Sequence, residues 1–440
     1  MKVTVVGGGR MGLPLACVLG KHGASVIVGD VNPKLVAQLQ SGECPYDEPG
    51  LSELVTLLHA NGRLTATTET RTAVSQSDVV IVIVPAHLTE DRYIDYSVLK
   101  AASEEVGRGL KPGALVIYET TVSAGGTRRN LIPVLEEFSG LKAGKDFAVA
   151  YSPERVKANL VMQRLETTPK VVGGLDEAAA QRAGDFYGQY LDAPTDNVGT
   201  LEAAEMTKLL GMLYRDVNIA LANELAAFCE LAGVDFERVR NAANRDGEAS
   251  LLLPGIGVGG HCTPVYPYFL TRESRRLGLT QRLSEAAREI NDQQPARHLD
   301  RLEAQWRSLH GKRVHILGLV FRPGVKVDTF SPAYPLLALL TQRGALVTLE
   351  DPYYDDAEIR AAGFSPATAF TSDVIILNTA HTQYAKPDFE AWERSGVRVL
   401  LDGRNFWPQA AVESVGLMYF GVGRAPTSNE SSRTDSLVAK

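Results

Sequence analysis

The feature that most constrains this chain is a glycine-rich turn that follows its first apolar segment. Val3–Val6 runs into Gly7-Gly8-Gly9-Arg10-Met11-Gly12, and a helical pattern begins near Leu13. Glycines at this spacing between a strand and a helix are typical of a Rossmann unit. Gly7 permits the tight turn, Gly9 lets the backbone approach a pyrophosphate, and Gly12 allows close packing of helix on strand. The turn therefore predicts a dinucleotide site at the positive end of the helix dipole, with Arg10 and Met11 beside it.

An acidic residue at the end of the next strand indicates which dinucleotide is bound. The predicted strand Ser25–Gly29 ends at Asp30, 18 residues after Gly12. An acid at this position can hydrogen-bond both ribose hydroxyls and would repel a 2′-phosphate, so NAD is favoured over NADP. The alternative is an ordinary glycine-rich turn beside a solvated aspartate, but the strand–turn–helix context argues against it.

The rest of the chain alternates apolar strands and amphipathic helices on both sides of a helical stretch. Leu201 to Leu231 has helical spacing of apolar residues and is predicted to be one long helix. We therefore expect an α/β protein with two doubly wound Rossmann-like domains joined by this helical region. The expected domains are 1–197, 198–297 and 298–424, followed by a disordered tail, 425–440. The predicted strands are Lys2–Val6, Ser25–Gly29, Val79–Val84, Leu115–Glu119, Phe147–Ala150, Val314–Leu317, Leu346–Glu350, Asp373–Leu377 and Val397–Leu401.

Charge and composition exclude several classes of function. The 440 residues carry a net charge of −7, whereas a nucleic-acid binder usually carries a basic stripe. No apolar run is long enough to span a bilayer, and the N-terminus lacks the apolar region of a signal peptide. The four cysteines are irregularly spaced, which predicts reduced thiols without disulfides or a cysteine-based metal site. We expect a cytoplasmic protein that binds neither nucleic acid nor membrane.

A second glycine cluster and two charged residues are candidates for the chemistry. The cluster Gly255–Gly260 leads to His261 and Cys262, where the thiol could be an activated nucleophile or a small buried side chain. Lys208 lies in a mostly apolar part of the long helix and could stabilise an oxyanion, although a lone lysine on a helix is more often solvated. Glu154 follows the Phe147–Ala150 strand and is a candidate base or substrate contact, or an ordinary loop acid.

These pieces occur in an order that resembles the UDP-glucose/GDP-mannose dehydrogenase family, to about residue 424. Within that family the chain is most similar to the branch acting on UDP-N-acetylhexosamines. The matching stretches are Cys44–Leu51, Glu119–Val122, Tyr151–Val156, Ala204–Leu209, Arg215–Ala220, Gly259–Cys262 and Asp351–Pro352.

The resemblance implies two successive hydride transfers from one sugar carbon to NAD. Cys262 would capture the intermediate aldehyde and Lys208 would stabilise the oxyanion. Glu154 would position water or act as a base, and Thr121 would hold the catalytic water or the cofactor. The resemblance also implies a homodimer formed through the long helix. Further cofactor and substrate contacts would be Pro85, Arg155, Val156, Arg215, Gly255, Gly259, Phe321 and Arg322, the last standing where the family usually has a lysine.

The chain departs from the family pattern at the centre of the site. Met212 replaces an asparagine that would join Lys208 at the oxyanion, and losing such a donor typically costs about 10²–10³ in rate. Tyr266 replaces an aspartate base, and a phenol with a pKa of about 10 is a poor base at neutral pH. Ala86-His87 replaces Thr-Pro in the turn after Val84-Pro85, and Val325–Thr329 lacks an Asp-Asp-x-Arg run.

Three hypotheses therefore remain open. The chain could oxidise its nucleotide sugar fully to the acid, or carry out one hydride transfer or none net. Less plausibly, it is a catalytically silent binding protein, against which the retained glycine turn, Asp30, Cys262 and Lys208 all argue. The alternative explanation for Met212 and Tyr266 is neutral drift that only reshapes the sugar pocket and leaves the reaction unchanged.

Overall fold

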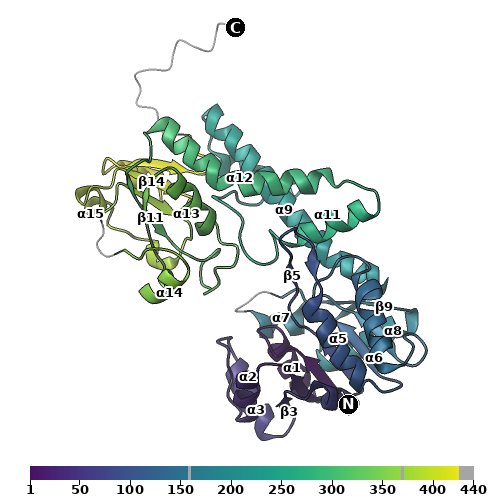
Figure 1. Cartoon of the computed structure of the whole chain (residues 1–440). Coiled ribbons are helices and arrows are strands. Elements are labelled where there is room, and N and C mark those ends of the chain that lie inside the picture. The colour runs from purple at the N-terminus through teal and green to yellow at the C-terminus, as the bar shows by residue number, and fades with distance from the viewer. Residues whose placement is uncertain (157–159, 368–370, 426–440) are drawn as a thin grey trace. The chain divides into compact units, whose positions relative to one another are not determined.

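The structure is a computed structural model that describes residues 1–156, 160–367 and 371–425 (Figure 1). The chain forms two compact units. The first comprises Met1–Gly211 with Tyr268–Thr280, and the second comprises Met212–Pro267 and the described chain from Gln281 onward. Of the predicted tail, only Ala425 lies within the described residues.

The first unit is built on an eight-stranded sheet. Its first six strands are parallel, in the order 3-2-1-4-5-6 of a doubly wound dinucleotide-binding fold. The other two strands run antiparallel to these, beginning with the pairing of Ala150 with Gly174. The sheet order is β3 (Leu64–Thr67), β2 (Ser25–Gly29), β1 (Lys2–Val6), β4 (Val79–Val82), β7 (Leu115–Tyr118), β8 (Ala148–Tyr151), β9 (Lys170–Gly174) and β10 (Thr195–Thr200).

Helices cover both faces of this sheet because successive strand residues point to opposite sides. In β4, Val79 and Ile81 belong to one apolar core, and Val80 and Val82 to the other. The first core is completed by α1 (Gly12–Lys21), α2 (Pro33–Gln40), α3 (Leu51–Ala60), α7 (Val161–Thr167) and α8 (Glu177–Tyr190). The second is completed by α4 (Thr70–Ser75), α5 (Ser97–Gly109), α6 (Ile132–Ser139) and the first turn of α9 (Leu201–Ala232).

The second unit contains a five-stranded parallel sheet in the order 2-1-3-4-5. It too has an apolar core on each face. The strands are β12 (Leu346–Glu350), β11 (Arg313–Leu317), β13 (Val374–Leu377), β14 (Val399–Asp402) and β15 (Met418–Gly421). One core contains α12 (Arg282–Gln305), α13 (Ala333–Gln342) and α14 (Asp356–Ala361), and the other η2 (Thr382–Tyr384), α15 (Phe389–Arg394) and α16 (Gln409–Glu413). The unit also contains α10 (Phe236–Ala243).

The predicted fold class is confirmed, and so is the long helix, which ends at Ala232. Two strands are shorter than predicted: β4 ends at Val82 and not at Val84, and β7 ends at Tyr118 and not at Glu119. Strands β3, β9, β10 and β15 were not predicted, and neither was the hairpin of β5 (His87–Leu88) and β6 (Ile94–Asp95). Among the described residues, no helix is long and apolar enough to cross a membrane.

Candidate active site

The glycine turn after β1 has the close contacts that its spacing predicts. Gly7 has a φ of +104°, and a Cβ there would lie 2.9 Å from the carbonyl oxygen of Ile83. A Cβ on Gly12 would lie 1.9 Å from the carbonyl oxygen of Gly7, so the start of α1 can approach the strand only with glycine at this position. A Cβ on Gly9 would meet nothing within 4 Å. This leaves open space beside the turn, which suits a pyrophosphate of NAD.

Asp30 is held beside this turn. One carboxylate oxygen accepts a hydrogen bond from the amide of Gly8 at 2.7 Å, and the other accepts one from the amide of Asn32 at 2.8 Å. The side chain is half-buried at the end of β2, where it can still accept hydrogen bonds from ribose hydroxyls. Arg10 is exposed and lies over the ring of Tyr46 at 5.6 Å. These residues fit an NAD molecule.

The loops after β4 and β7 are tied together next to the point between β1 and β4 where the strand order reverses. Ligands bind at such switch points in open α/β sheets. The hydroxyl of Thr120 donates to the carbonyl of Val84 at 2.5 Å. Pro85 is exposed on one loop, and Thr121 is buried on the other. The two residues predicted to contact the cofactor or its water are thus on neighbouring loops.

A buried charge cluster lies at the ends of β7, β8 and β9. The ammonium of Lys170 is 2.8 Å from Glu119 and 3.3 Å from Glu154. Burial opposes the ionisation of Glu154, but the charge of Lys170, the amide of Val156 and the charge of Lys208 together outweigh it and lower the pKa of Glu154 below its ordinary value. Glu119 is only 1% exposed, and burial raises its pKa to about 7 despite Lys170. Tyr187 also donates to Glu119 at 2.5 Å. One lysine therefore serves two carboxylates, of which Glu154 is the more ionised.

Lys170 was not predicted as a site residue from the sequence, and Glu119 was predicted only as part of a strand and of a motif. The available signal was a charged residue at the start of the apolar run Lys170–Gly174, because a lysine in a buried strand needs a partner. Its partners come from two other strands and could not be found from sequence spacing alone.

The structure brings Lys208 and Glu154 together. The Lys208 ammonium donates to the backbone carbonyl of Glu154 at 2.6 Å, and the lysine is half-buried. The Glu154 carboxylate accepts from its neighbours' amides, Arg155 at 2.6 Å and Val156 at 2.8 Å. It is therefore fixed in position. Met212 is half-buried one helical turn after Lys208, on the same side of α9.

Glu205, one turn before Lys208, links α9 to the loop that carries Thr121. Its carboxylate accepts from the amides of Gly125 at 2.5 Å and Thr127 at 2.9 Å, at the start of the π-helix η1 (Thr127–Leu131). Burial raises the pKa of Glu205 to about 7. In the sequence, Glu205 is only one residue of the stretch Ala204–Leu209, and in the structure it caps this loop.

In the second unit, the cluster Gly255–Gly260 is packed tightly against its surroundings. A Cβ on Gly259 would lie 2.5 Å from the Cβ of Phe321, and one on Gly257 would lie 2.8 Å from Pro332. Gly260 has a φ of +93° and faces the Phe321 ring. Glycines at this density allow either a ligand or a neighbouring chain segment to approach closely, and at these three glycines the structure shows a chain segment. Gly259 and Phe321, both predicted substrate contacts, are thereby brought together.

A buried amide chain holds the first residue of this loop. The amide of Gly255 donates to Asn223 at 2.9 Å, Asn223 donates to Asn291 at 2.9 Å, and Asn291 donates to Asp216 at 2.9 Å. Arg288 pairs with Asp216 at 2.6 Å. The loop that leads to the candidate nucleophile is thus anchored on α9 and α12.

The remaining candidates of the second unit lie on different elements. Cys262 is half-buried, and its carbonyl accepts from the amide of Tyr266 at 2.9 Å. Tyr266 is half-buried and begins α11 (Tyr266–Arg276), so the thiol lies one turn before a helix. Arg322 is half-buried, whereas Arg215 is exposed on α9. Among the described residues, no group of three or more His, Cys, Asp or Glu could hold a metal ion.

The glycine turn, the acid beside it and the strand order together define a dinucleotide-binding fold of the kind that NAD-dependent dehydrogenases use. Three domain models match the chain in order. They are the NAD binding domain of the UDP-glucose/GDP-mannose dehydrogenase family at residues 1–191, its central domain at 202–293 and its UDP binding domain at 315–409. The chain belongs to this family of nucleotide-sugar oxidoreductases.

Relatives in this family are named for different sugars. The chain is 33% identical to a UDP-N-acetyl-D-glucosamine 6-dehydrogenase of Pseudomonas aeruginosa, over 87% of this chain and 91% of that protein. It is 31% identical to an NDP-N-acetyl-D-galactosaminuronic acid dehydrogenase of Ralstonia solanacearum, over 92% and 96%. The solved structure of a UDP-D-ManNAc dehydrogenase from Pyrococcus horikoshii superposes with a TM-score of 0.87 at 30% identity, covering 96% of this chain and 99% of that one.

Proposed function

We propose that this protein oxidises C6 of a UDP-sugar, with a UDP-N-acetylhexosamine as the favoured substrate. The observation that carries the proposal is the arrangement of Lys208 against Glu154, with the Glu154 carboxylate kept ionised by Lys170. A fixed ammonium beside a fixed carboxylate can stabilise a developing alkoxide and orient a hydroxyl or a water. The names of the relatives support the substrate class.

Bound NAD would supply the hydride acceptor. In the first step the C6 alcohol loses a hydride to NAD and a proton to the site, which gives an aldehyde. In the second, the Cys262 thiol adds to the aldehyde carbon, forming a C–S bond and a hydroxyl group. Loss of a proton and of a second hydride, to a second NAD that has replaced the NADH, would then give a thioester, and water would replace sulfur to give the acid and the free thiol.

The residues of this chain would divide these tasks. Lys208 would stabilise the oxyanion of each step, and Glu154 would orient the hydroxyl and later the water. Thr121 would hold the water or the cofactor. The other predicted contacts with the nucleotide sugar are Arg155, Val156, Arg215, Gly255, Gly259, Phe321 and Arg322.

A second candidate function is a single hydride transfer, or a transfer followed by its return. The half-buried Met212 favours it, because an apolar side chain stands one turn from Lys208 where a second donor would help the oxyanion. Tyr266 favours it as well, since a phenol is a poor base for releasing the acid. This function would give an aldehyde, or an epimerised or rearranged sugar nucleotide.

The yield of reduced cofactor separates these functions. The purified protein is incubated with NAD and a panel of UDP- and GDP-sugars, and NADH and product mass are measured. Full oxidation gives two NADH per sugar and a uronic acid. One NADH with an aldehyde, or a product without NADH, supports the second function. If no sugar of the panel is converted, the chain is a silent binding protein and both catalytic proposals fail.

The role of the thiol is tested with Cys262→Ala. We expect this variant to lose acid formation, because no thioester can form. Cys229→Ala is the matched control, since Cys229 is a buried thiol on α9 that has no proposed chemical role. A Cys262→Ala variant that makes acid at the wild-type rate would refute the covalent step.

We also propose that the protein is a homodimer formed through α9. Tyr214, Leu221 and Phe228 recur every seven residues on this helix and are 59%, 46% and 68% exposed. An apolar stripe of this kind is costly in water and fits a second copy of the helix. Phe228→Glu should convert a dimer into a monomer in sedimentation experiments. Leu57→Glu, at a 59% exposed position on α3, should not.

A further inference from the structure

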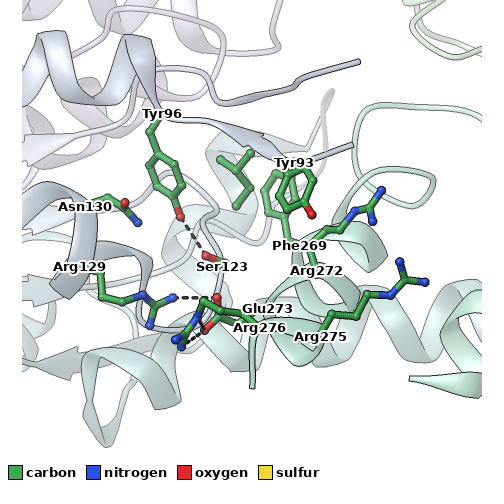
Figure 2. A pocket seen from close by; sticks show the side chains of 11 residues that line it. Tyr93, Tyr96, Ser123, Arg129, Asn130, Phe269, Arg272, Glu273, Arg275 and Arg276 are labelled. Atoms are coloured by element: carbon green, nitrogen blue, oxygen red, sulfur yellow. Dashed lines mark hydrogen bonds and ion pairs between the residues drawn. The ribbon is translucent and has the colours of Figure 1, made fainter. Parts of the chain in front are cut away.

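The first unit contains a cavity of about 540 Å³ that none of the predicted cofactor or substrate residues lines. It is bounded by the end of the β5–β6 hairpin, the loop before η1, η1 itself and α11, whose lining side chains are drawn in Figure 2. This volume is within the range of small-molecule sites, about 300–1,000 Å³. The cavity is therefore large enough for a ligand of its own.

The charged side chains of the cavity are strongly unbalanced. Four arginines and one glutamate line it, although the whole chain is acidic. Glu273 accepts ion pairs from Arg129 at 2.8 Å and from Arg276 at 2.6 Å. Figure 2 shows these three side chains gathered in the lower part of the view. One carboxylate cannot neutralise two guanidinium groups, so this end of the cavity has an excess of positive charge.

Another arginine of the cavity, Arg272, has a buried hydrogen-bond donor without an acceptor among the described residues. The Nε of Arg272 is buried and has no hydrogen-bond partner within the described residues. The same guanidinium donates to the carbonyl of Asp91 at 2.7 Å and lies 4.7 Å from the centre of the Tyr93 ring, so it is held in place. A buried donor without an acceptor costs free energy, and such groups in native structures commonly mark the place of a ligand or a water.

Aromatic side chains form the other walls. Tyr93, Tyr96 and Phe269 line the cavity above the Arg129–Glu273 pair in Figure 2. The Tyr96 hydroxyl is hydrogen-bonded to that of Ser123 at 2.9 Å, which fixes its ring. Rings of this kind bind planar or apolar groups. Guanidinium groups bind phosphate oxygens through paired hydrogen bonds.

We propose that this cavity binds a small phosphate monoester with an aromatic or heterocyclic body. The phosphate pairs with the excess arginine charge, and the body lies against the tyrosine and phenylalanine rings. A phosphate suits the cavity better than a single carboxylate, because its several oxygens can pair with more than one of the four arginines that line it. The site is separate from the residues proposed for catalysis, so its test does not depend on turnover.

The test is calorimetric titration of the full-length protein with phenyl phosphate in the presence of saturating NAD. Inorganic phosphate and phenol are titrated in parallel. We expect saturable binding of phenyl phosphate with a Kd in the millimolar range or below, and weaker binding of phosphate and phenol alone. Equal binding of inorganic phosphate would mean an adventitious ion only and would overturn the proposal, as would the absence of saturation with phenyl phosphate.

Arginine variants locate the binding. Arg276→Gln should weaken phenyl phosphate binding about tenfold, the effect of losing a charged hydrogen bond. Arg108→Gln removes the same charge from an exposed ion pair on α5 and should leave the affinity unchanged. Equal losses in the two variants would assign binding to net charge and refute the site. Thermal unfolding checks that each variant is folded. If Arg276→Gln is not folded, Arg275→Gln replaces it, because Arg275 also lines the cavity and is exposed.

Discussion

Replacing Lys170 with methionine tests the buried charge cluster most directly. Lys170 is 6% exposed, and its ammonium is 2.8 Å from Glu119 and 3.3 Å from Glu154. Without it, two carboxylates remain in an apolar environment with no cation between them. Removing one partner of a buried ion pair typically costs about 3–5 kcal/mol. We therefore expect Lys170→Met to lower the free energy of unfolding of the first unit by about that amount.

The matched control is Lys111→Met, which removes a lysine from an exposed pair. Lys111 is 3.2 Å from Asp78, and the two side chains are 39% and 48% exposed. Such surface pairs contribute about 1 kcal/mol or less. In urea, with an m-value of about 3 kcal/mol/M or more for a unit of this size, Lys170→Met should lower the unfolding midpoint by about 1 M. The control should barely move it.

The difference between wild type and Lys170→Met should also depend on pH. The folded-state pKa of Glu154 is lowered, so its ionised form stabilises the fold above its ordinary pKa of 4.5, and this stabilisation is lost as the pH falls through the lowered value. The pKa of Glu119 is raised to about 7, so its ionisation costs stability as the pH rises from 4.5 to about 7. Without Lys170 both carboxylates ionise less readily, and the variant should be more defective at pH 8 than at pH 5. Equal midpoints for Lys170→Met and Lys111→Met, or a gap that does not grow with pH, would refute this reasoning.

Four further predictions concern single residues. Asp30→Asn should lower the NAD-to-NADP ratio of kcat/KM at least about tenfold, because two unit charges at 4 Å repel by about 4 kcal/mol at an effective dielectric constant of 20; an unchanged ratio would refute the role of Asp30. Gly259→Ala should destabilise the protein by about 1–3 kcal/mol through a 2.5 Å clash, whereas Gly188→Ala, which meets no neighbour within 4 Å, should not, and equal urea midpoints would contradict this. The pKa of Glu205 is raised to about 7, so its ionisation should lower the wild-type free energy of unfolding by up to about 3 kcal/mol as the pH rises from 4.5 to 7. In Glu205→Gln this loss of stability should be absent from pH-dependent unfolding, and its persistence would assign it to another group. If release of the acid limits turnover, Tyr266→Asp should raise the yield of uronic acid per sugar, and a yield no higher than wild type would exclude the missing carboxylate as the cause.

The sequence was sufficient for features that depend on residues close together in the chain. The glycine turn, the position of Asp30 at the end of β2 and the length of α9 all follow from local spacing. Lys208 and Glu154 were both singled out from the sequence, but their contact joins residues 54 positions apart and appears only in the fold.

The features that sequence analysis missed are those that depend on distant partners. Lys170 pairs with Glu119, which is 51 residues away, and Glu205 accepts a hydrogen bond from an amide 80 residues away. The aromatic and arginine residues of the arginine-lined cavity come from three separate segments that carry no common motif. Strand β10 has the sequence TDNVGT, whose polar residues give no strand pattern, and it forms as an edge strand through its pairing with β9.

The geometry of Glu154 bears on how far the reaction runs. One of its carboxylate oxygens accepts from two backbone amides and the other pairs with Lys170, so its pKa is lowered and it is a weak base at neutral pH. A residue in this state is better suited to holding a hydroxyl or a water than to removing its proton. With Tyr266 in place of an acid, the step with the least support in this chain is the one that activates water. The first oxidation does not require activation of water, and Lys208 can stabilise its alkoxide directly. The state of Glu154 therefore favours a reaction that stops at, or passes through, the aldehyde, as Met212 and Tyr266 do.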